Sequence, residues 1–357
     1  MSRTKGAKGK KNKAKIILEI VKKQEKFETP LSEESRKRVE KGLQEAKEGK
    51  ISPLEPNDLV EKNNIQISQE RKDRLNTTLR EINKIVPDSV KYANTIEIKE
   101  RQSFGYKCLD KLTNGGIIRG NFTTIWGSKA CGKSTIAYKM IATAQKEGKI
   151  ATYLDIERSY DPLWAAKFGV NVNDLVIVNI ETAEQALDTI IKLCREDVID
   201  LIVLDSIQGL TPKQENYAGK GEKERSVEDD SMALLARKLS QFFRMAAAPV
   251  SKAKCAILLI GQARMDLSSF IKLETLSGGH ALLHNSRLIL RLRRGQKTDA
   301  PMEKRPNGKL TEKGKEEMEN VPIGFDLVIT VQKSQIWGCV EGDSVHVPFY
   351  SEDGIHE

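Results

Sequence analysis

Long apolar runs, paired cysteines and clustered histidines are all missing from this sequence of 357 residues. It contains no stretch of about 18 apolar residues, which is the length that a membrane helix needs. The basic N-terminus runs into the apolar segment IILEIV, which is too short for the core of a signal peptide. We therefore expect a protein that is neither membrane-spanning nor secreted.

The five cysteines are widely spaced, form no C-x-x-C pair and are odd in number. Such a set indicates neither a disulfide framework nor a zinc site, and it is typical of a reducing compartment. Of the four histidines only His280 and His284 form a close pair, so we do not expect a histidine-based metal site.

The formal net charge of +9 is mostly a property of the N-terminal tail. Residues 1–15 contain seven lysines and arginines and no acid, which leaves 52 basic against 50 acidic residues in 16–357. With its Gly, Asn and Ala spacers the tail cannot bury apolar surface, so we expect it to be disordered. Two interpretations stay open: a nucleic-acid-binding arm, or a tail that only increases solubility.

Residues 16–94 have a helical pattern but few apolar residues that could form a hydrophobic core. The segment 32–50 predicts a helix that is charged on most faces. A second helix is expected from about Ser68 to Val86, ending at Pro87. Its apolar stripe consists of Leu75, Leu79, Ile82 and Val86. Such a stripe needs a partner, which is either the protein's own core or a neighbouring subunit.

From Thr95 onward short apolar strands alternate with helical segments, a pattern typical of a mostly parallel sheet with helices on both faces. The first informative strand, NFTTIWG, leads into the spacing G-x-x-x-x-G-K-[ST] and then into an apolar helix. Backbone amides of such a loop surround phosphate oxygens, its lysine supplies a positive charge, and its serine hydroxyl binds magnesium. The predicted phosphate-binding residues are Gly127, Ser128, Lys129, Ala130, Cys131, Gly132, Lys133, Ser134 and Thr135.

Two acids follow the next strands. Glu157 comes directly after the strand that begins at Ile150, and Asp205 closes the strand that begins at Ile199. The carboxyl ends of parallel strands border the crevice in which such sheets bind ligands. We expect Asp205 to hold magnesium together with Ser134, and Glu157 to orient and deprotonate an attacking water. The alternatives are a helix-capping role for Asp205 and a plain surface position for Glu157.

A fourth apolar strand, from Cys255 to Gln262, ends in an amide side chain. Gln262 is placed to sense the terminal phosphate and to reposition the chain that follows it. The alternative is a strand-end glutamine whose side chain bonds to the backbone.

Taken in order, the motifs resemble the RecA family of DNA recombinases, including its phage members of the UvsX type. The runs that carry the resemblance are YLDIERSYDPLWAAKFGV, LIVLDSIQGLTPK, SMALLARKLSQFFRMAA, ILLIGQARM and SGGHALLHNSRLILRLRR. The resemblance covers about 95–357 and implies an α/β fold: a RecA-like P-loop ATPase core, preceded by a helical N-terminal segment. It also implies the cytoplasm of a bacterium or of a phage-infected host cell, with a nuclear or organellar location left open.

The resemblance assigns roles around the nucleotide. It implies that Glu157 is the catalytic base, that Asp161 contacts the adenine, and that Trp164 stacks near it; for Trp164 an ordinary core position is the alternative. Lys333 matches one of two family lysines that reach the ATP of the neighbouring subunit, whereas Gln335 replaces the other.

Two polar segments, about 212–231 and 264–278, look too irregular for strands and directly follow the strands that carry nucleotide ligands. A change in the bound nucleotide can therefore order or release these two segments. Such a change is a physical basis for DNA binding that depends on ATP. The resemblance places single-stranded DNA along these two loops. The residues that it implies are Met232 and Leu267 as wedges between bases, Arg237, Arg264 and Lys272 as backbone contacts, Phe270 as a stacking or subunit contact, and Gly278 and Gly279. For Met232 an ordinary helix-core position is the alternative.

The resemblance thus implies a DNA-dependent ATPase that uses ATP and Mg²⁺, hydrolyses ATP to ADP and phosphate, and forms a helical homo-oligomeric filament on single-stranded DNA. Its activity would be homologous pairing with double-stranded DNA and strand exchange in recombinational repair of DNA damage. Two alternatives remain: a mediator or annealing protein without strand exchange, and a hexameric helicase on the related fold. Asp266, where a basic residue is expected, and Gln335 favour the mediator. The charged insertion 295–320 predicts an exposed loop or hairpin.

Overall fold

The computed structural model of the chain describes residues 68–87, 89–90, 92–93, 96, 98–213, 229–265, 274–276, 280–296, 300–310 and 316–357. The chain divides into two compact units, Met1–Ile96 and Glu97–Glu357. The expected basic tail 1–15 and the helix expected within 32–50 lie outside the described residues.

The helix expected near 68–86 is confirmed as α3, Gln69–Ile85. None of its residues is buried, and Leu75 and Ile82 of the apolar stripe are 46% and 39% exposed. The chain after α3 folds back along it: Asn83 Nδ2 donates to the Val90 carbonyl at 3.1 Å, and the Tyr92 hydroxyl donates to Asn76 Oδ1 at 2.6 Å. The partner that the stripe needs is therefore not found among the described residues of its own unit.

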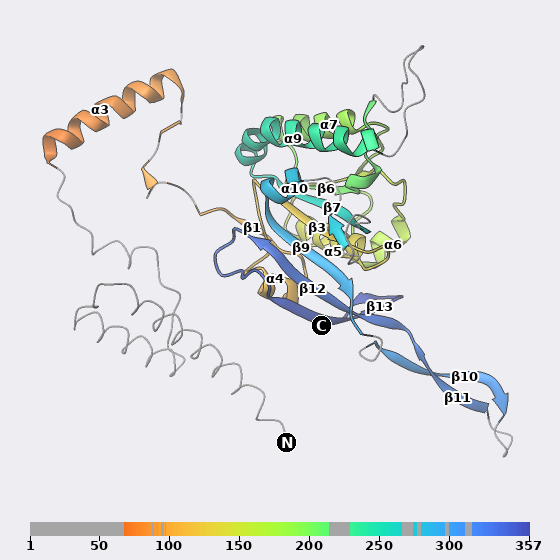
Figure 1. Cartoon of the computed structure of the whole chain (residues 1–357). Coiled ribbons are helices and arrows are strands. Elements are labelled where there is room, and N and C mark those ends of the chain that lie inside the picture. Colours follow the sequence, from red (N-terminus) through yellow and green to blue (C-terminus); the bar gives the residue numbers. More distant parts are fainter. Residues whose placement is uncertain are drawn as a thin grey trace, which may run out of the picture. The chain divides into compact units, whose positions relative to one another are not determined.

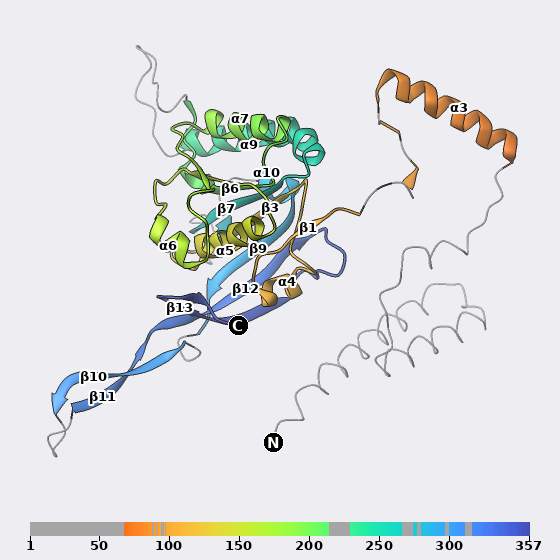
Figure 2. The same cartoon turned by 180° about the vertical axis from the view of Figure 1, so that it is seen from behind.

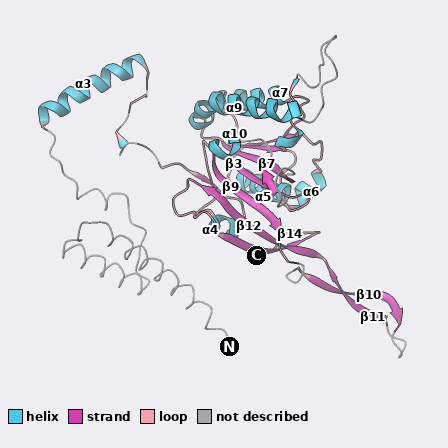
Figure 3. Cartoon of the chain, in the orientation of Figure 1, coloured by secondary structure: helices cyan, strands magenta, loops and turns pink. Residues whose placement is uncertain are grey.

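The second unit is built on one large sheet, in which the described residues place ten strands. Figures 1 and 3 show it at the centre of this unit. The parallel strands, in spatial order, are β9 (Ser286–Arg294), β3 (Phe122–Gly127), β7 (Ala256–Met265), β6 (Leu201–Asp205), β4 (Ala151–Asp155) and β5 (Val176–Val178). Beyond β9 follow the antiparallel strands β12 (Gly324–Ser334), β13 (Ser344–Tyr350) and β14 (Gly354–Ile355). The expected mostly parallel sheet is confirmed.

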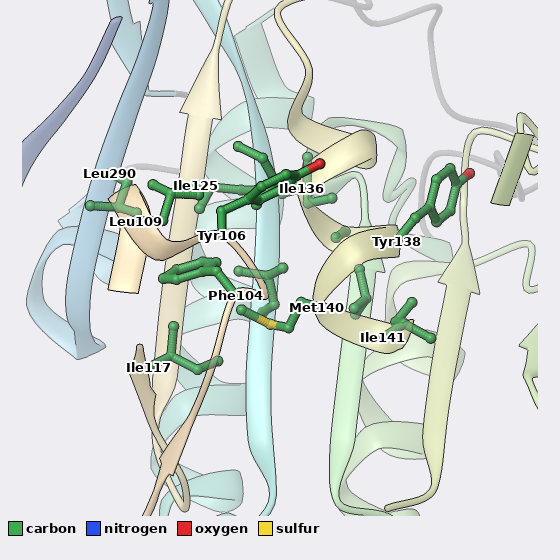
Figure 4. Close-up of a cluster of buried hydrophobic side chains, with 14 of the residues drawn as sticks. Phe104, Tyr106, Leu109, Ile117, Ile125, Ile136, Tyr138, Met140, Ile141 and Leu290 are labelled. Atoms are coloured by element: carbon green, nitrogen blue, oxygen red, sulfur yellow. The ribbon is translucent and has the colours of Figure 1, made fainter. Parts of the chain in front are cut away.

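Helices cover both faces of the sheet because successive side chains of its strands point in opposite directions. In β6, Leu201 and Val203 join the core under α5 (Lys133–Lys146), whereas Ile202 and Leu204 join the core under α7 (Ala183–Arg195) and α9 (Asp229–Lys252). Figure 4 shows part of the first of these cores, which contains Ile136, Met140 and Ile141 of α5 together with Phe104 and Ile125. Shorter helices are α4 (Lys107–Leu112), α6 (Pro162–Lys167) and α10 (His280–Asn285).

Two further strand pairs lie outside the large sheet. Strands β1 (Arg101–Gln102) and β2 (Ile117–Ile118) form a small antiparallel pair. Strands β10 (Met302–Leu310) and β11 (Glu316–Pro322) form an antiparallel hairpin that projects from the core in both views (Figures 1 and 2). The exposed hairpin expected in the insertion 295–320 is therefore confirmed.

The chain after Gln262 differs from the sequence prediction. Strand β7 continues to Met265, and its end pairs with β8 (Glu274–Leu276), so that Ala263 lies opposite Leu276 and Met265 opposite Glu274. The prediction that 264–278 is too irregular for strands is therefore wrong for 264–265 and for 274–276. The pairing joins segments about ten residues apart, and a local hydrophobic pattern does not reveal such contacts.

The first expected loop, 212–231, also ends earlier than predicted, because α9 already begins at Asp229. This helix contains Pro249 in its last turn and ends at Lys252. None of the described helices is long and apolar enough to cross a membrane.

Candidate active site

The predicted phosphate loop lies between the end of β3 and the start of α5. Gly132 has a φ of 87°, in the left-handed region that favours glycine. A Cβ atom at this position would lie 2.6 Å from Cε2 of Phe349, so a larger residue does not fit here. The first backbone amides of an α-helix have no intrahelical partners, and the helix dipole adds partial positive charge at the start of α5. The loop is therefore shaped as a cradle for phosphate groups.

Lys133 is buried, and its side chain curls back over the loop. Its Nζ donates to the carbonyl of Gly127 at 3.1 Å and to that of Ser128 at 2.7 Å. These contacts hold the ammonium group at the cradle, where it can meet phosphate oxygens. Burial raises the pKa of the nearby Cys131 thiol, although the charge of Lys133 opposes this effect.

The predicted metal ligands Ser134 and Asp205 are brought together. The Ser134 hydroxyl donates to Asp205 Oδ2 at 2.6 Å, and the Tyr153 hydroxyl donates to the same oxygen at 2.6 Å. Asp205 is only 5% exposed, and burial raises the pKa of its carboxyl group against the effect of these two hydrogen bonds. Two adjacent hard oxygen ligands beside a phosphate cradle fit magnesium, and Asp205 does not cap a helix with its side chain.

Glu157 stands on a turn that the buried Asp155 anchors. The Asp155 carboxylate accepts hydrogen bonds from the backbone amides of Ser159 at 3.0 Å and Tyr160 at 2.9 Å. Glu157 Oε1 in turn accepts hydrogen bonds from the Ser206 hydroxyl and from the side-chain amide of Gln262. The structure thus joins the expected base directly to the expected phosphate sensor.

Asp161 and Trp164 have structural contacts. Asp161 Oδ1 caps α6 by accepting from the backbone amides of Leu163 at 2.9 Å and Trp164 at 3.2 Å. The Trp164 ring is partly buried against the core and meets Phe168 edge-on, with ring centroids 5.0 Å apart. The geometry thus agrees with the core position for Trp164, and the adenine contacts of both residues stay predictions.

A cavity of about 310 Å³ opens in front of the phosphate loop. Beyond the loop it is lined by Arg294, Phe325, Phe349 and Ser351. Arg294 Nη2 donates to the Ala130 carbonyl at 3.0 Å, and its guanidinium lies 4.5 Å from the centroid of the Phe325 ring. Phe325 in turn stacks on Phe349, with centroids 4.7 Å apart. The sequence did not predict that these four residues line the cavity. They lie at or beside the ends of three strands that are far apart in the sequence, and no motif marks them.

Replacing Arg294 with alanine is expected to weaken ATP binding by about tenfold, because a charge-assisted hydrogen bond to the phosphate loop and one wall of the cavity are lost. Titration of the variant with a fluorescent ATP analogue, in the absence of DNA, measures the effect. Arg293→Ala removes the neighbouring exposed arginine of the same strand and serves as the control. Equal affinities of the two variants would show that Arg294 does not shape the cavity.

Lys333 is not brought to the phosphate loop of its own chain. It pairs with Ile289 of β9, whereas Gly127 pairs with Leu292, so Lys333 lies toward the other end of the sheet. Its Nζ donates to the carbonyls of Leu283 and His284, and burial lowers its pKa, with a smaller contribution from Arg287. Only a contact across a subunit boundary would take Lys333 to a nucleotide, and that contact stays a prediction.

Among the predicted DNA contacts, Arg237 is exposed on α9 and Arg264 is exposed on β7. Met232 lies in the first turn of α9. The remaining predicted contacts lie outside the described residues: Leu267, Phe270, Lys272, Gly278 and Gly279. Within the described residues of this region, Arg291 Nη2 binds Glu274 Oε2 at 2.9 Å and its guanidinium lies 5.2 Å from the centroid of the Trp126 ring. This ion pair fixes β8, the returning end of the second loop, to β9.

Comparison with known proteins gives a family match and similar curated proteins. The sequence model of the RecA N-terminal domain matches residues 74–313. Protein RecA of Agrobacterium fabrum is 37% identical over 203 residues, which cover 56% of this chain and 54% of the relative. Protein RecA of Colwellia psychrerythraea is 37% identical over 203 residues, with 56% and 57% covered. Protein RecA of Teredinibacter turnerae is 38% identical over 181 residues, with 50% and 51% covered. The chain thus spans about half the length of the curated relatives that it matches.

Proposed function

Because this chain belongs to the RecA family, we propose that it is an ATP-dependent DNA recombinase. It assembles on single-stranded DNA and promotes homologous pairing and strand exchange with double-stranded DNA. The observation that carries the proposal is the contact between Glu157 and Gln262, because it links the hydrolytic base to the strand that leads into the second DNA loop.

Four side chains support ATP hydrolysis as the reaction of this site. Lys133 and the loop amides stabilise negative charge on the phosphates, and Glu157 orients and deprotonates the attacking water. Ser134 and Asp205 would hold a magnesium ion, which would neutralise negative charge on the phosphates when it is bound. The products are ADP and phosphate.

DNA binding depends on the nucleotide through Gln262. A terminal phosphate competes with Glu157 for the Gln262 amide, and Gln262 is followed within β7 by Arg264 and then by the second loop. The numbers of basic and acidic residues outside the tail are nearly equal. Affinity for DNA therefore comes from individual cations at the interface, such as Arg237 and Arg264, rather than from the net charge of the protein. We assign Leu267, Phe270, Lys272, Gly278 and Gly279 to the same interface.

Filament formation uses the exposed stripe of α3 and the reach of Lys333. A stripe of apolar side chains without a buried member suits a head-to-tail contact with the next subunit, and a repeated contact that does not close produces a helical filament. Lys333 then contacts the nucleotide of that neighbour.

A second candidate function, a mediator or annealing protein without strand exchange, is favoured by Gln335. This residue replaces the second lysine expected at the subunit boundary, and its Oε1 accepts a hydrogen bond from Arg287 Nη1 of its own chain at 3.0 Å.

A displacement-loop assay with ATP, read beside electron micrographs of the full chain, separates the candidates. Filaments that form joint molecules with homologous duplex are the result expected for a recombinase. Filaments without pairing identify the mediator, and closed rings that unwind duplex DNA identify a hexameric helicase. Either of these last two results overturns the proposal.

A further inference from the structure

The backbone pairing between β6 and β7 ends before β7 does. Its last paired residues are Asp205 of β6 and Ile260 of β7, after which the chain turns away into a 3₁₀ turn, Ile207–Gly209. Gln262 lies two residues beyond the last pair, and groups two residues apart in a strand face the same side. On the side toward β6, the backbone of Gln262 therefore needs a partner other than a strand.

The side chain of Gln208, in the 3₁₀ turn, supplies that partner. Its Oε1 accepts a hydrogen bond from the backbone amide of Gln262 at 2.7 Å, and its Nε2 donates to the carbonyl of Gln262 at 3.3 Å. A primary amide carries both a donor and an acceptor, so it substitutes for the peptide group of a neighbouring strand. Gln208 continues the ladder at the point where β6 has left it.

Close packing of β7 and partial burial both stabilise the contact between Gln208 and Gln262. A Cβ atom on the preceding Gly261 would lie 2.7 Å from Cδ1 of Leu276 and 3.2 Å from the Trp126 Cβ, so β7 is tightly packed at this point. Both hydrogen bonds are partly buried, where a lost partner costs more than it does in water. With its backbone held on this side, Gln262 directs its side chain to Glu157.

We propose that Gln208 is a positioning residue for Gln262, which sets the geometry of the Glu157–Gln262 contact and thereby couples ATP hydrolysis to DNA. The inference rests on the proposed function, because it assumes that hydrolysis responds to single-stranded DNA. Gln208 has no hydrogen bond to the phosphate loop among the described residues, so it acts through Gln262 and not on the nucleotide directly.

The test is the steady-state hydrolysis of ATP by the full chain, with and without single-stranded DNA. Gln208→Ala is expected to lower the DNA-stimulated kcat by about 10- to 100-fold, since a displaced sensor misplaces its contact with the base. The KM for ATP is expected to stay within about twofold, because the phosphate loop is untouched. Gln208→Glu keeps the length and the acceptor but loses the donor, and it is expected to lie between Gln208→Ala and the wild type. The control is Gln241→Ala, an exposed amide on α9, for which no change is expected.

A double-mutant cycle with Gln262→Ala separates positioning from general damage to the fold. If Gln208 acts through Gln262, the double variant is no slower than Gln262→Ala alone. Additive losses, or a rise in KM equal to the fall in kcat, would overturn the inference. If Gln208→Ala does not fold, Gln208→Glu takes its place in the double-mutant cycle with Gln262→Ala.

The outcomes for the inference and for the proposed function are distinct. A wild-type chain whose hydrolysis ignores single-stranded DNA overturns the proposed function. A wild-type chain that responds to DNA, with a Gln208→Ala variant that responds equally, leaves the proposed function intact and overturns the role of Gln208.

Discussion

Replacing Glu157 with glutamine is expected to lower kcat for ATP hydrolysis by about 10²- to 10⁴-fold while leaving ATP and single-stranded DNA binding in place. The amide keeps the size of the side chain but cannot take a proton from the attacking water. It also still has an oxygen to accept the hydrogen bonds from Ser206 and Gln262. Steady-state ATP turnover and equilibrium binding to a fluorescent oligonucleotide measure the two parts of this result.

The matched control for this prediction is Glu196→Gln, which changes an exposed acid at the end of α7 in the same way. It is expected to hydrolyse ATP at the wild-type rate. A wild-type rate of ATP hydrolysis in Glu157→Gln would show that Glu157 is not the catalytic base.

Replacing Lys133 with alanine is expected to lower kcat/KM for ATP by about 10³-fold, because the positive charge at the phosphate cradle disappears. The carbonyls of Gly127 and Ser128 lose their donor as well, so the loop also loses part of its internal support. ATP-dependent binding of single-stranded DNA should be lost together with hydrolysis. Nucleotide titration and oligonucleotide binding, measured on the same preparation, test both losses.

Lys146→Ala, at the exposed C-terminal end of the same helix α5, is the control for Lys133→Ala. Its thermal stability, ATP affinity and turnover are expected to match the wild type. A Lys133→Ala variant that is folded and hydrolyses ATP normally would contradict the assignment of the phosphate loop.

Local sequence determines the parts of the site that could be predicted. The strand, the glycine-containing loop and the helix around Lys133 are contiguous in the chain, so their spacing alone predicts the cradle. Asp205 could be predicted because its strand is short, apolar and closes on an acid. The meeting of Asp205 and Ser134 then follows from the position of both at the same edge of the sheet.

Long-range contacts determine the parts that could not be predicted. The contacts of Gln208 with Gln262 and of Arg294 with Ala130 join residues more than 50 positions apart, and no periodicity records them. The pairing of β8 with the end of β7 joins segments only about ten residues apart, but it too leaves no mark in the local hydrophobic pattern. The capping of α6 by Asp161 was likewise absent from the sequence prediction, which gave this residue only the adenine contact that the resemblance implies.

The central claim is that ATP at the phosphate loop controls DNA binding through Glu157 and Gln262. The most direct test is the affinity of Glu157→Gln for a fluorescent single-stranded oligonucleotide, with Mg²⁺–ATP and without nucleotide. Because this variant retains bound ATP, we expect an affinity about tenfold or more higher with the nucleotide, at one fixed salt concentration. Equal affinities in the two conditions would contradict the claim.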